Sequence, residues 1–200
     1  MSISSNIASD IAGPAATDQD SADSDDPGRS PAEIIETDPR WLGIDGLRSV
    51  MTVATATAIT RAGRDTDAVA LTIALSNDDE VRDLNSQYRG KDQPTNVLSF
   101  PAGDFPLDPD MQSVREFVGD IILAYDTIEQ EAVADGKPFA HHAVHLAVHG
   151  VLHLLGYDHE YDESAEEMER IEIEVLASLG IPNPYAENDA DNFAGAAART

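Results

Sequence analysis

Two hydrophobic periodicities alternate along the chain and limit what it can fold into. Val69, Leu71, Ile73 and Leu75 occupy every second position, as in a strand with one buried face. In residues 46–61 the apolar side chains instead recur every three or four positions, as on the buried face of a helix. Strands and helices mixed in this way predict an α+β domain in which helices pack on a small sheet.

The same reasoning assigns a type to each segment between the two ends. Asn77 followed by Glu80 is a capping-box pattern, and Gly90 and Gly156 are expected to end helices. A first strand falls at either residues 2–7 or residues 33–37. We expect further strands at 69–75, 96–100 and 118–123, and helices at 46–61, 78–89, 126–134 and 141–155. A last helix is expected to begin with Asp162 or Ser164 as its cap and to end before Gly180.

The composition changes towards both ends of the chain. Residues 1–40 are acidic and rich in Ser, Ala and Asp, which predicts a largely disordered N-terminal extension. Residues 186–200 are expected to form a flexible tail, so residues 41–185 form the single predicted domain. The sequence has no cysteine, no signal-like N-terminus and no apolar run of about 20 residues. We therefore expect a cytoplasmic protein that does not cross a membrane.

Negative charge is spread through the chain. The net charge is −26, of which residues 1–40 contribute −7 and residues 186–200 contribute −2, which leaves −17 in residues 41–185. Such a field repels nucleic acid at long range and weighs against RNA binding. A high internal salt concentration would screen this repulsion.

Three histidines in one short segment form a candidate metal site. His149 and His153 are four residues apart, so in a helix their imidazoles share one face and can bind one ion. Gly156 can adopt a positive φ, reverse the chain and bring His159 to the same point. Three imidazoles leave a fourth position for water, as in catalytic zinc sites. Zinc suits this ligand set best, with nickel or iron as alternatives.

A competing triad would use His145 with His149 and His153. These three residues span roughly 12 Å of helix axis, which is too far for the outer pair to meet at one tetrahedral ion. We therefore assign His145, together with His141 and His142, to supporting or surface roles. For His145 these roles include contact with a metal ligand or with nucleic acid.

The histidine spacing matches that of the metzincin proteases with one difference. Gly150 stands where those enzymes carry the glutamate that takes a proton from water. Without that general base, efficient peptide hydrolysis by the metzincin route is not expected.

Four blocks of the sequence form a combined pattern. The blocks are His149-Gly150-x-Leu152-His153-Leu154-x-Gly156-Tyr157-Asp158-His159, Leu84-Asn85-x-x-Tyr88-Arg89-Gly90-Lys91-Asp92-x-Pro94-Thr95-Asn96-Val97-Leu98-Ser99-Phe100-Pro101, Gly119-Asp120-Ile121 and Glu166-Glu167-Met168-Glu169. Together they resemble the YbeY family of bacterial rRNA-maturation endoribonucleases, and they lie in that family's order between about residues 45 and 185.

The resemblance implies a small mixed sheet surrounded by helices, and one Zn²⁺ per chain on His149, His153 and His159. It also implies a single-strand-specific endoribonuclease that acts in 16S rRNA 3′-end maturation and ribosome quality control. Its partners would be single-stranded rRNA, the small ribosomal subunit and ribosome-associated proteins, but not DNA. The family's functional arginine corresponds to Arg89, whose guanidinium can donate two hydrogen bonds to a phosphate.

Two other functions stay open from the sequence. One is a different metallohydrolase that takes its general base from elsewhere, although Gly150 argues against a peptidase. The other is a ribosome-associated binding protein whose zinc is structural, which the acidic surface favours. Arg89 also has a structural alternative, because a cation at the end of a helix stabilises the helix dipole.

Overall fold

The computed structural model describes residues 30–103, 115–158 and 162–186, and the chain folds there as strands and helices mixed along the sequence. The elements are β1 (Ala32–Glu36), η1 (Pro39–Gly43), α2 (Leu47–Arg61), β2 (Val69–Ser76), α3 (Asp78–Arg89), β3 (Val97–Pro101), β4 (Glu116–Ala124), α4 (Tyr125–Ala134), α5 (Phe139–Leu154) and α6 (Asp162–Ser178).

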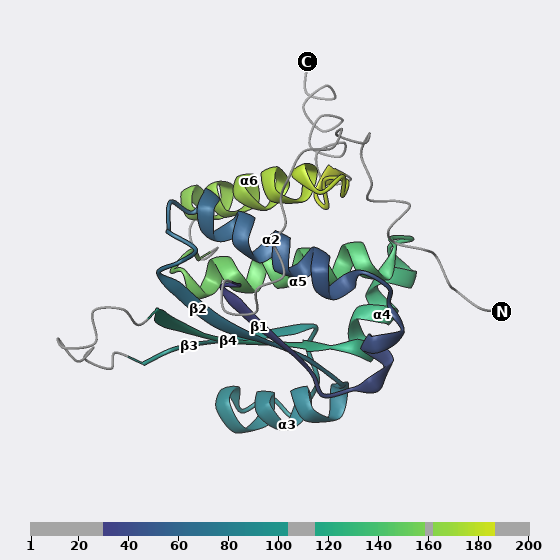
Figure 1. Ribbon diagram of the computed structural model, residues 1–200. Helices are drawn as coiled ribbons and strands as arrows, with labels where there is room; N and C mark the ends of the chain where they lie inside the picture. Colours follow the sequence, from purple (N-terminus) through teal and green to yellow (C-terminus); the bar gives the residue numbers. More distant parts are fainter. Residues whose placement is uncertain (1–29, 104–114, 159–161, 187–200) are drawn as a thin grey trace, which may run out of the picture.

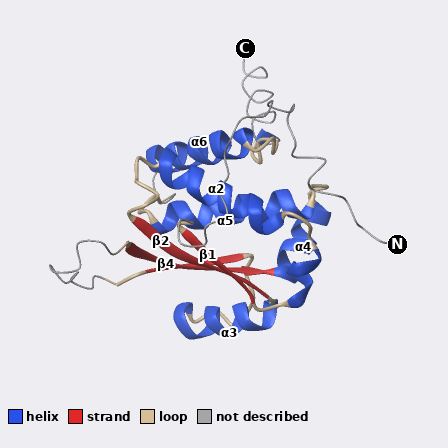
Figure 2. Ribbon diagram, viewed as in Figure 1, coloured by secondary structure: helices blue, strands red, loops and turns tan. Residues whose placement is uncertain are grey.

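The four strands form one mixed sheet in the order β1-β2-β4-β3. β1, β2 and β4 run parallel to one another, and β3 runs antiparallel to β4 at the edge. Helices α2, α5 and α6 lie on one face of the sheet, whereas α3 covers the other (Figures 1 and 2). The expected α+β class, with a small mixed sheet and packed helices, is confirmed.

The period of two in β2 has a direct structural reason. Val69, Leu71, Ile73 and Leu75 are buried, and the residues between them are only partly covered. Because β2 lies between β1 and β4, it has no free edge. The alternation therefore turns one side of the strand towards the core that the sheet shares with the helices.

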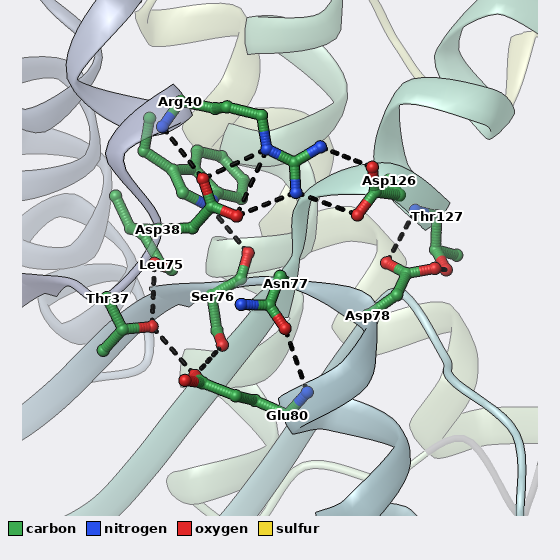
Figure 3. Close-up of polar contacts among 11 residues, drawn as sticks. Thr37, Asp38, Arg40, Leu75, Ser76, Asn77, Asp78, Glu80, Asp126 and Thr127 are labelled. Atoms are coloured by element: carbon green, nitrogen blue, oxygen red, sulfur yellow. Dashed lines mark hydrogen bonds and ion pairs between the residues drawn. The ribbon is translucent and has the colours of Figure 1, made fainter.

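The expected helix ends at Asn77 and Gly90 are found. The Asn77 Oδ1 accepts a hydrogen bond from the Glu80 backbone N–H at 3.0 Å, which caps α3, and Gly90 ends the helix with a φ of 68°. The Glu80 carboxylate does not complete a capping box. It accepts instead from the hydroxyls of Thr37 and Ser76 (Figure 3), which tie β1 and β2 to α3.

An ion cluster closes the carboxyl ends of β1, β2 and β4, and we call Asp38, Arg40 and Asp126 the Arg40 clamp (Figure 3). The Arg40 guanidinium donates to both carboxylates, at 2.8 Å to Asp38 Oδ2 and at 2.5 and 2.9 Å to the two oxygens of Asp126. It also lies 4.3 Å from the centre of the Tyr125 ring. The clamp fixes the segment after β1 to the start of α4.

The sequence offers two positions for the first strand. Within the described residues, β1 (Ala32–Glu36) pairs in parallel with β2, which confirms a strand near residues 33–37. The other position, residues 2–7, lies outside the described residues. The division of the chain at residues 41 and 185 stays a prediction, and β1 precedes the first of these boundaries. None of the helices in the described ranges is long and apolar enough to span a bilayer.

Candidate metal centre

Helix α5 carries the predicted histidines on its one partly exposed stripe. Phe139 and the five histidines of this helix are half-buried, and every other residue of α5 is buried. Helix α5 packs against β3 and β4 on one side and against α2, α4 and α6 on others. The core therefore fixes the helix, and its imidazoles line the side that remains open.

Gly150 lets this helix approach the sheet closely. A β-carbon at Gly150 would lie 2.9 Å from Cγ2 of Ile121 on β4 and 3.1 Å from the Ser99 hydroxyl on β3. The same Ser99 hydroxyl donates to the Gly150 carbonyl at 3.4 Å. The glycine at the metzincin glutamate position thus has a packing reason, because a glutamate side chain has no room there.

His149 is oriented by a buried carboxylate from α6. Its Nδ1 lies 2.8 Å from Oε1 of Glu172, whose side chain is 0% exposed. Burial raises the pKa of the Glu172 carboxyl, but hydrogen bonds from His145 and His149 outweigh burial and hold that pKa at about 2. The carboxylate is therefore ionised and can only accept, so the Nδ1 of His149 carries the proton.

His153 is oriented by the turn that follows the helix. Gly156 has a φ of 93°, the left-handed conformation expected from the sequence. The turn brings the backbone carbonyl of Tyr157 to 3.0 Å from the Nδ1 of His153. Because a carbonyl oxygen can only accept, this Nδ1 also carries its proton.

With the Nδ1 of each ring directed at an acceptor, Nε2 is the ring nitrogen that can bind a metal ion, and the two Nε2 atoms lie 3.0 Å apart. Two nitrogens on one tetrahedral zinc, each about 2.0–2.1 Å from the ion, lie about 3.3 Å apart. The two side chains therefore fit adjacent positions on one metal ion.

His145 does not join this pair. Its Nε2 lies 3.0 Å from Oε2 of Glu172 and 3.3 Å from the Tyr185 hydroxyl, so it faces the carboxylate rather than the two Nε2 atoms. The supporting role expected for His145 agrees with this position. His142 lies 2.7 Å from Oε2 of Glu131 on α4.

His159, the third predicted ligand, lies outside the described residues. Among the residues that the structure describes, no group of three His, Asp or Glu side chains is placed to hold a metal ion. The full triad of His149, His153 and His159 therefore stays a prediction, of which the structure describes two members.

Arg89, the predicted catalytic residue, is exposed at the end of α3, on the opposite face of the sheet from α5 (Figure 1). Within the described ranges its guanidinium makes no hydrogen bond or ion pair. Lys91, two residues further, is also exposed. Among the described residues, no contact joins Arg89 to the histidines of α5, so its part in the site stays a prediction.

Sequence reasoning missed Glu172 and Tyr185. The signal for Glu172 was present, because this acid falls between Met168, Ile171 and Val175 on the apolar stripe of α6. A charged residue on a buried face is rarely accidental, since it needs partners that compensate its burial. The partners themselves could not be found without knowing that α6 packs beside α5.

Comparisons with known proteins agree on one family. Residues 44–180 match the family model described as Endoribonuclease YbeY. Proteins named Endoribonuclease YbeY from two Rhodopseudomonas palustris strains are similar to this chain. The CGA009 protein is 49% identical over 78% of this chain and 80% of its own length, and the BisB18 protein is 51% identical over 80% and 95%.

A similarly named protein from Bradyrhizobium diazoefficiens is 44% identical over 78% of this chain and 85% of its own length. The solution structure of TM1509 from Thermotoga maritima aligns with 73% of this chain and 89% of its own, at 25% identity and a TM-score of 0.49. The family match covers most of the described domain, and it includes the histidine helix, α3 and the whole of β2–β4. The chain therefore belongs to the endoribonuclease YbeY family.

Proposed function

We propose that this chain is a zinc-dependent endoribonuclease that cleaves single-stranded rRNA, in 16S rRNA 3′-end maturation and ribosome quality control. It would work in the cytoplasm with the small ribosomal subunit and its associated proteins. Family membership supports RNA cleavage, since the similar proteins are named endoribonucleases. The zinc dependence is supported by one observation, the Nε2 atoms of His149 and His153, which lie 3.0 Å apart.

The proposed zinc ligands are His149, His153 and His159. When bound, zinc supplies a Lewis acid for the phosphate oxygens and lowers the pKa of a coordinated water. The protein's part is to hold two imidazoles with Nε2 towards the ion, through Glu172 on one ring and the Tyr157 carbonyl on the other. The close packing at Gly150 holds the helix against β3 and β4.

Arg89 is the proposed contact to the scissile phosphate. A guanidinium can donate two parallel hydrogen bonds to phosphate oxygens and stabilise the charge that builds on them. Its exposure and its lack of an ion pair in the described ranges leave it available for that role. With Lys91 it forms a small basic site on a chain of net charge −26, where a local cation offsets the repulsion of RNA.

The test measures bound zinc and cleavage of a single-stranded RNA oligonucleotide on the same samples. We expect His149→Ala to lose both zinc and cleavage. Arg89→Ala should keep its zinc and lose about 10²–10³-fold in cleavage rate, as when one donor to a transition-state oxyanion is removed. Lys91→Ala is the matched control and should change the rate far less. Zinc-free protein that cleaves at the full rate would exclude the zinc mechanism, and full activity of Arg89→Ala would exclude the arginine.

The products separate two routes for the attacking oxygen. A 2′,3′-cyclic phosphate identifies attack by the neighbouring ribose 2′-oxygen, whereas a 3′-hydroxyl with a 5′-phosphate identifies attack by water. A duplex of the same sequence serves as the substrate control. It should be cut much more slowly if the enzyme requires a single strand.

The charge of the chain favours a second candidate, a ribosome-associated binding protein whose zinc is structural. A net charge of −26 suits contact with basic proteins better than contact with bare RNA. A folded His153→Ala protein that restores rRNA maturation in cells lacking the wild-type protein would support this candidate. Failure of that protein with its fold intact would support the enzyme.

A further inference from the structure

Glu172 is a charged side chain on the apolar stripe of α6. It is fully buried, and Met168, Ile171 and Val175 beside it on the stripe are buried as well. Transfer of an isolated carboxylate from water to such surroundings costs several kcal/mol unless hydrogen bonds compensate it. A position that the fold could fill with a leucine therefore carries an acid, and its contacts indicate what the acid does.

Three donors from two other segments converge on this carboxylate. Oε1 accepts from the Nδ1 of His149 at 2.8 Å. Oε2 accepts from the Nε2 of His145 at 3.0 Å and from the Tyr185 hydroxyl. Burial raises the pKa of Tyr185, and the Glu172 charge raises it further, so this hydroxyl keeps its proton and donates. Oε2 thus accepts two hydrogen bonds, and Oε1 accepts the one from His149.

The contact of Oε1 with His149 decides which nitrogen of that ring carries the proton. A neutral imidazole carries its proton on either nitrogen, and the partner of one nitrogen decides which. An acceptor at Nδ1 places the proton there and leaves the electron pair on Nε2, which points towards the Nε2 of His153. Carboxylates in contact with the remote nitrogen of a metal-bound histidine are a common device for orienting the ring.

We propose that Glu172 is a positioning residue that holds His149 in the Nδ1–H form with Nε2 presented to zinc, and that Tyr185 and His145 hold Glu172 for this task. The proposal rests on the zinc site proposed above. It adds a carboxylate from α6 and a tyrosine from the segment after α6 to a site otherwise built on α5 and the turn that follows. Loosening α6 should therefore weaken zinc binding.

The first measurement needs no metal. Long-range ¹H–¹⁵N correlation spectra of ¹⁵N-histidine-labelled, zinc-free protein at pH 8 report the protonated nitrogen of each ring. We expect His149 as the Nδ1–H form in wild type and a shift towards the Nε2–H form in Glu172→Met, which fills the same space without an acceptor. Glu172→Gln keeps one acceptor oxygen and should restore much of the wild-type signal. A purely structural role would leave the tautomer unchanged.

The second measurement is the zinc dissociation constant by competition with a chelator. Glu172→Met should weaken zinc about 10–100-fold, as is usual when the partner of a metal-bound histidine is removed. Tyr185→Phe, which leaves the acceptor in place, should weaken it less and provides a reading if Glu172→Met does not fold. Glu129→Met makes the same chemical change at an exposed position of α4 and should bind zinc like wild type.

The outcomes separate this inference from the function on which it rests. If wild type binds no zinc, the zinc site fails whatever the tautomer. If wild type binds zinc but both the tautomer and the affinity are unchanged in Glu172→Met and in Tyr185→Phe, the positioning role alone is overturned.

Discussion

The Arg40 clamp and the histidine stripe of α5 are both built from charged or titratable groups, but they differ in how their polar atoms are matched. In the clamp, the guanidinium donates to two carboxylates, and each carboxylate accepts at least two hydrogen bonds from it. In the stripe, two imidazole nitrogens that can both bind a metal ion lie 3.0 Å apart. The clamp pairs a cation with two anions, whereas the stripe brings together two potential ligands of a cation.

The two clusters also lie at different places in the fold. The clamp closes the carboxyl ends of the parallel strands, where α/β proteins often bind ligands, and in this chain an ion cluster fills that position. The Trp41 indole N–H donates to the Ser76 carbonyl at the end of β2. His149 and His153 lie in the second half of α5. Matched donors and acceptors stabilise the fold, whereas two imidazoles held side by side are suited to bind an ion.

The largest expected difference between the clusters is their response to zinc. At a free zinc concentration of about 1,000 times the dissociation constant, binding to the folded state raises the free energy of unfolding by about 4 kcal/mol. His153→Ala should abolish this gain and leave the zinc-free stability close to that of wild type, because the His153 side chain is only partly buried. Chemical denaturation with and without zinc measures both quantities.

Arg40→Met is the control for that experiment, because it alters the other cluster. It should lose stability without zinc and still gain the full zinc increment. An equal zinc response in wild type and His153→Ala would show that the stripe does not bind the ion and would remove the contrast between the two regions.

The sequence was sufficient for most of the elements because their causes are local. The period of two in β2, the Asn77 cap and the positive φ of Gly90 and Gly156 each depend on residues within a few positions. β1 was harder, since a five-residue strand carries little periodicity of its own. Only its pairing with β2, some 40 residues later, determines it.

The same distinction between local and distant causes applies to the site. Helical spacing was enough to predict that His149 and His153 share a face, and their Nε2 atoms do meet. Glu172 and Tyr185 could not be found in this way, because they reach His149 and His145 through the packing of α6 on α5. Whether His159 and Arg89 complete the site depends on positions that spacing alone does not determine.

The second prediction tests the clamp by removing its cation. Arg40→Met leaves Asp38, with a side chain only 10% exposed, without its guanidinium partner. We expect a loss of about 2 kcal/mol in the free energy of unfolding at pH 7, as for hydrogen bonds to a charged group. Asp126 is more exposed and should contribute less. Urea denaturation measures the loss, and Arg82→Met, at an exposed ion pair with Asp92, is a matched control that should cost far less.

The pH dependence of that loss identifies its origin. Hydrogen bonds from Arg40 lower the pKa of Asp38 and of Asp126 in the folded state. A lowered carboxyl pKa contributes stability above the unfolded value of about 3.9, and that contribution disappears as the pH falls through the folded-state pKa. The difference between wild type and Arg40→Met should therefore be constant from pH 7 to about pH 5 and shrink below pH 4. A difference that does not change down to pH 2 would mean that the loss comes from packing against Tyr125.

The smallest predicted effect concerns the contact that holds the histidine stripe against the sheet. Gly150→Ala gains about 0.5–1 kcal/mol of helix propensity, but the new β-carbon would lie 2.9 Å from Cγ2 of Ile121 and force α5 away from β4. Overpacking of this kind costs typically about 1–3 kcal/mol, so we expect a net loss of about 1 kcal/mol. Gly43→Ala, where a β-carbon would meet nothing within 4 Å, is the control and should be neutral or slightly stabilising. If α5 moves as a rigid element, zinc affinity should fall together with stability in Gly150→Ala. An unchanged affinity would show that Glu172 and the turn at Gly156 hold the imidazoles of His149 and His153 in place even when α5 itself shifts.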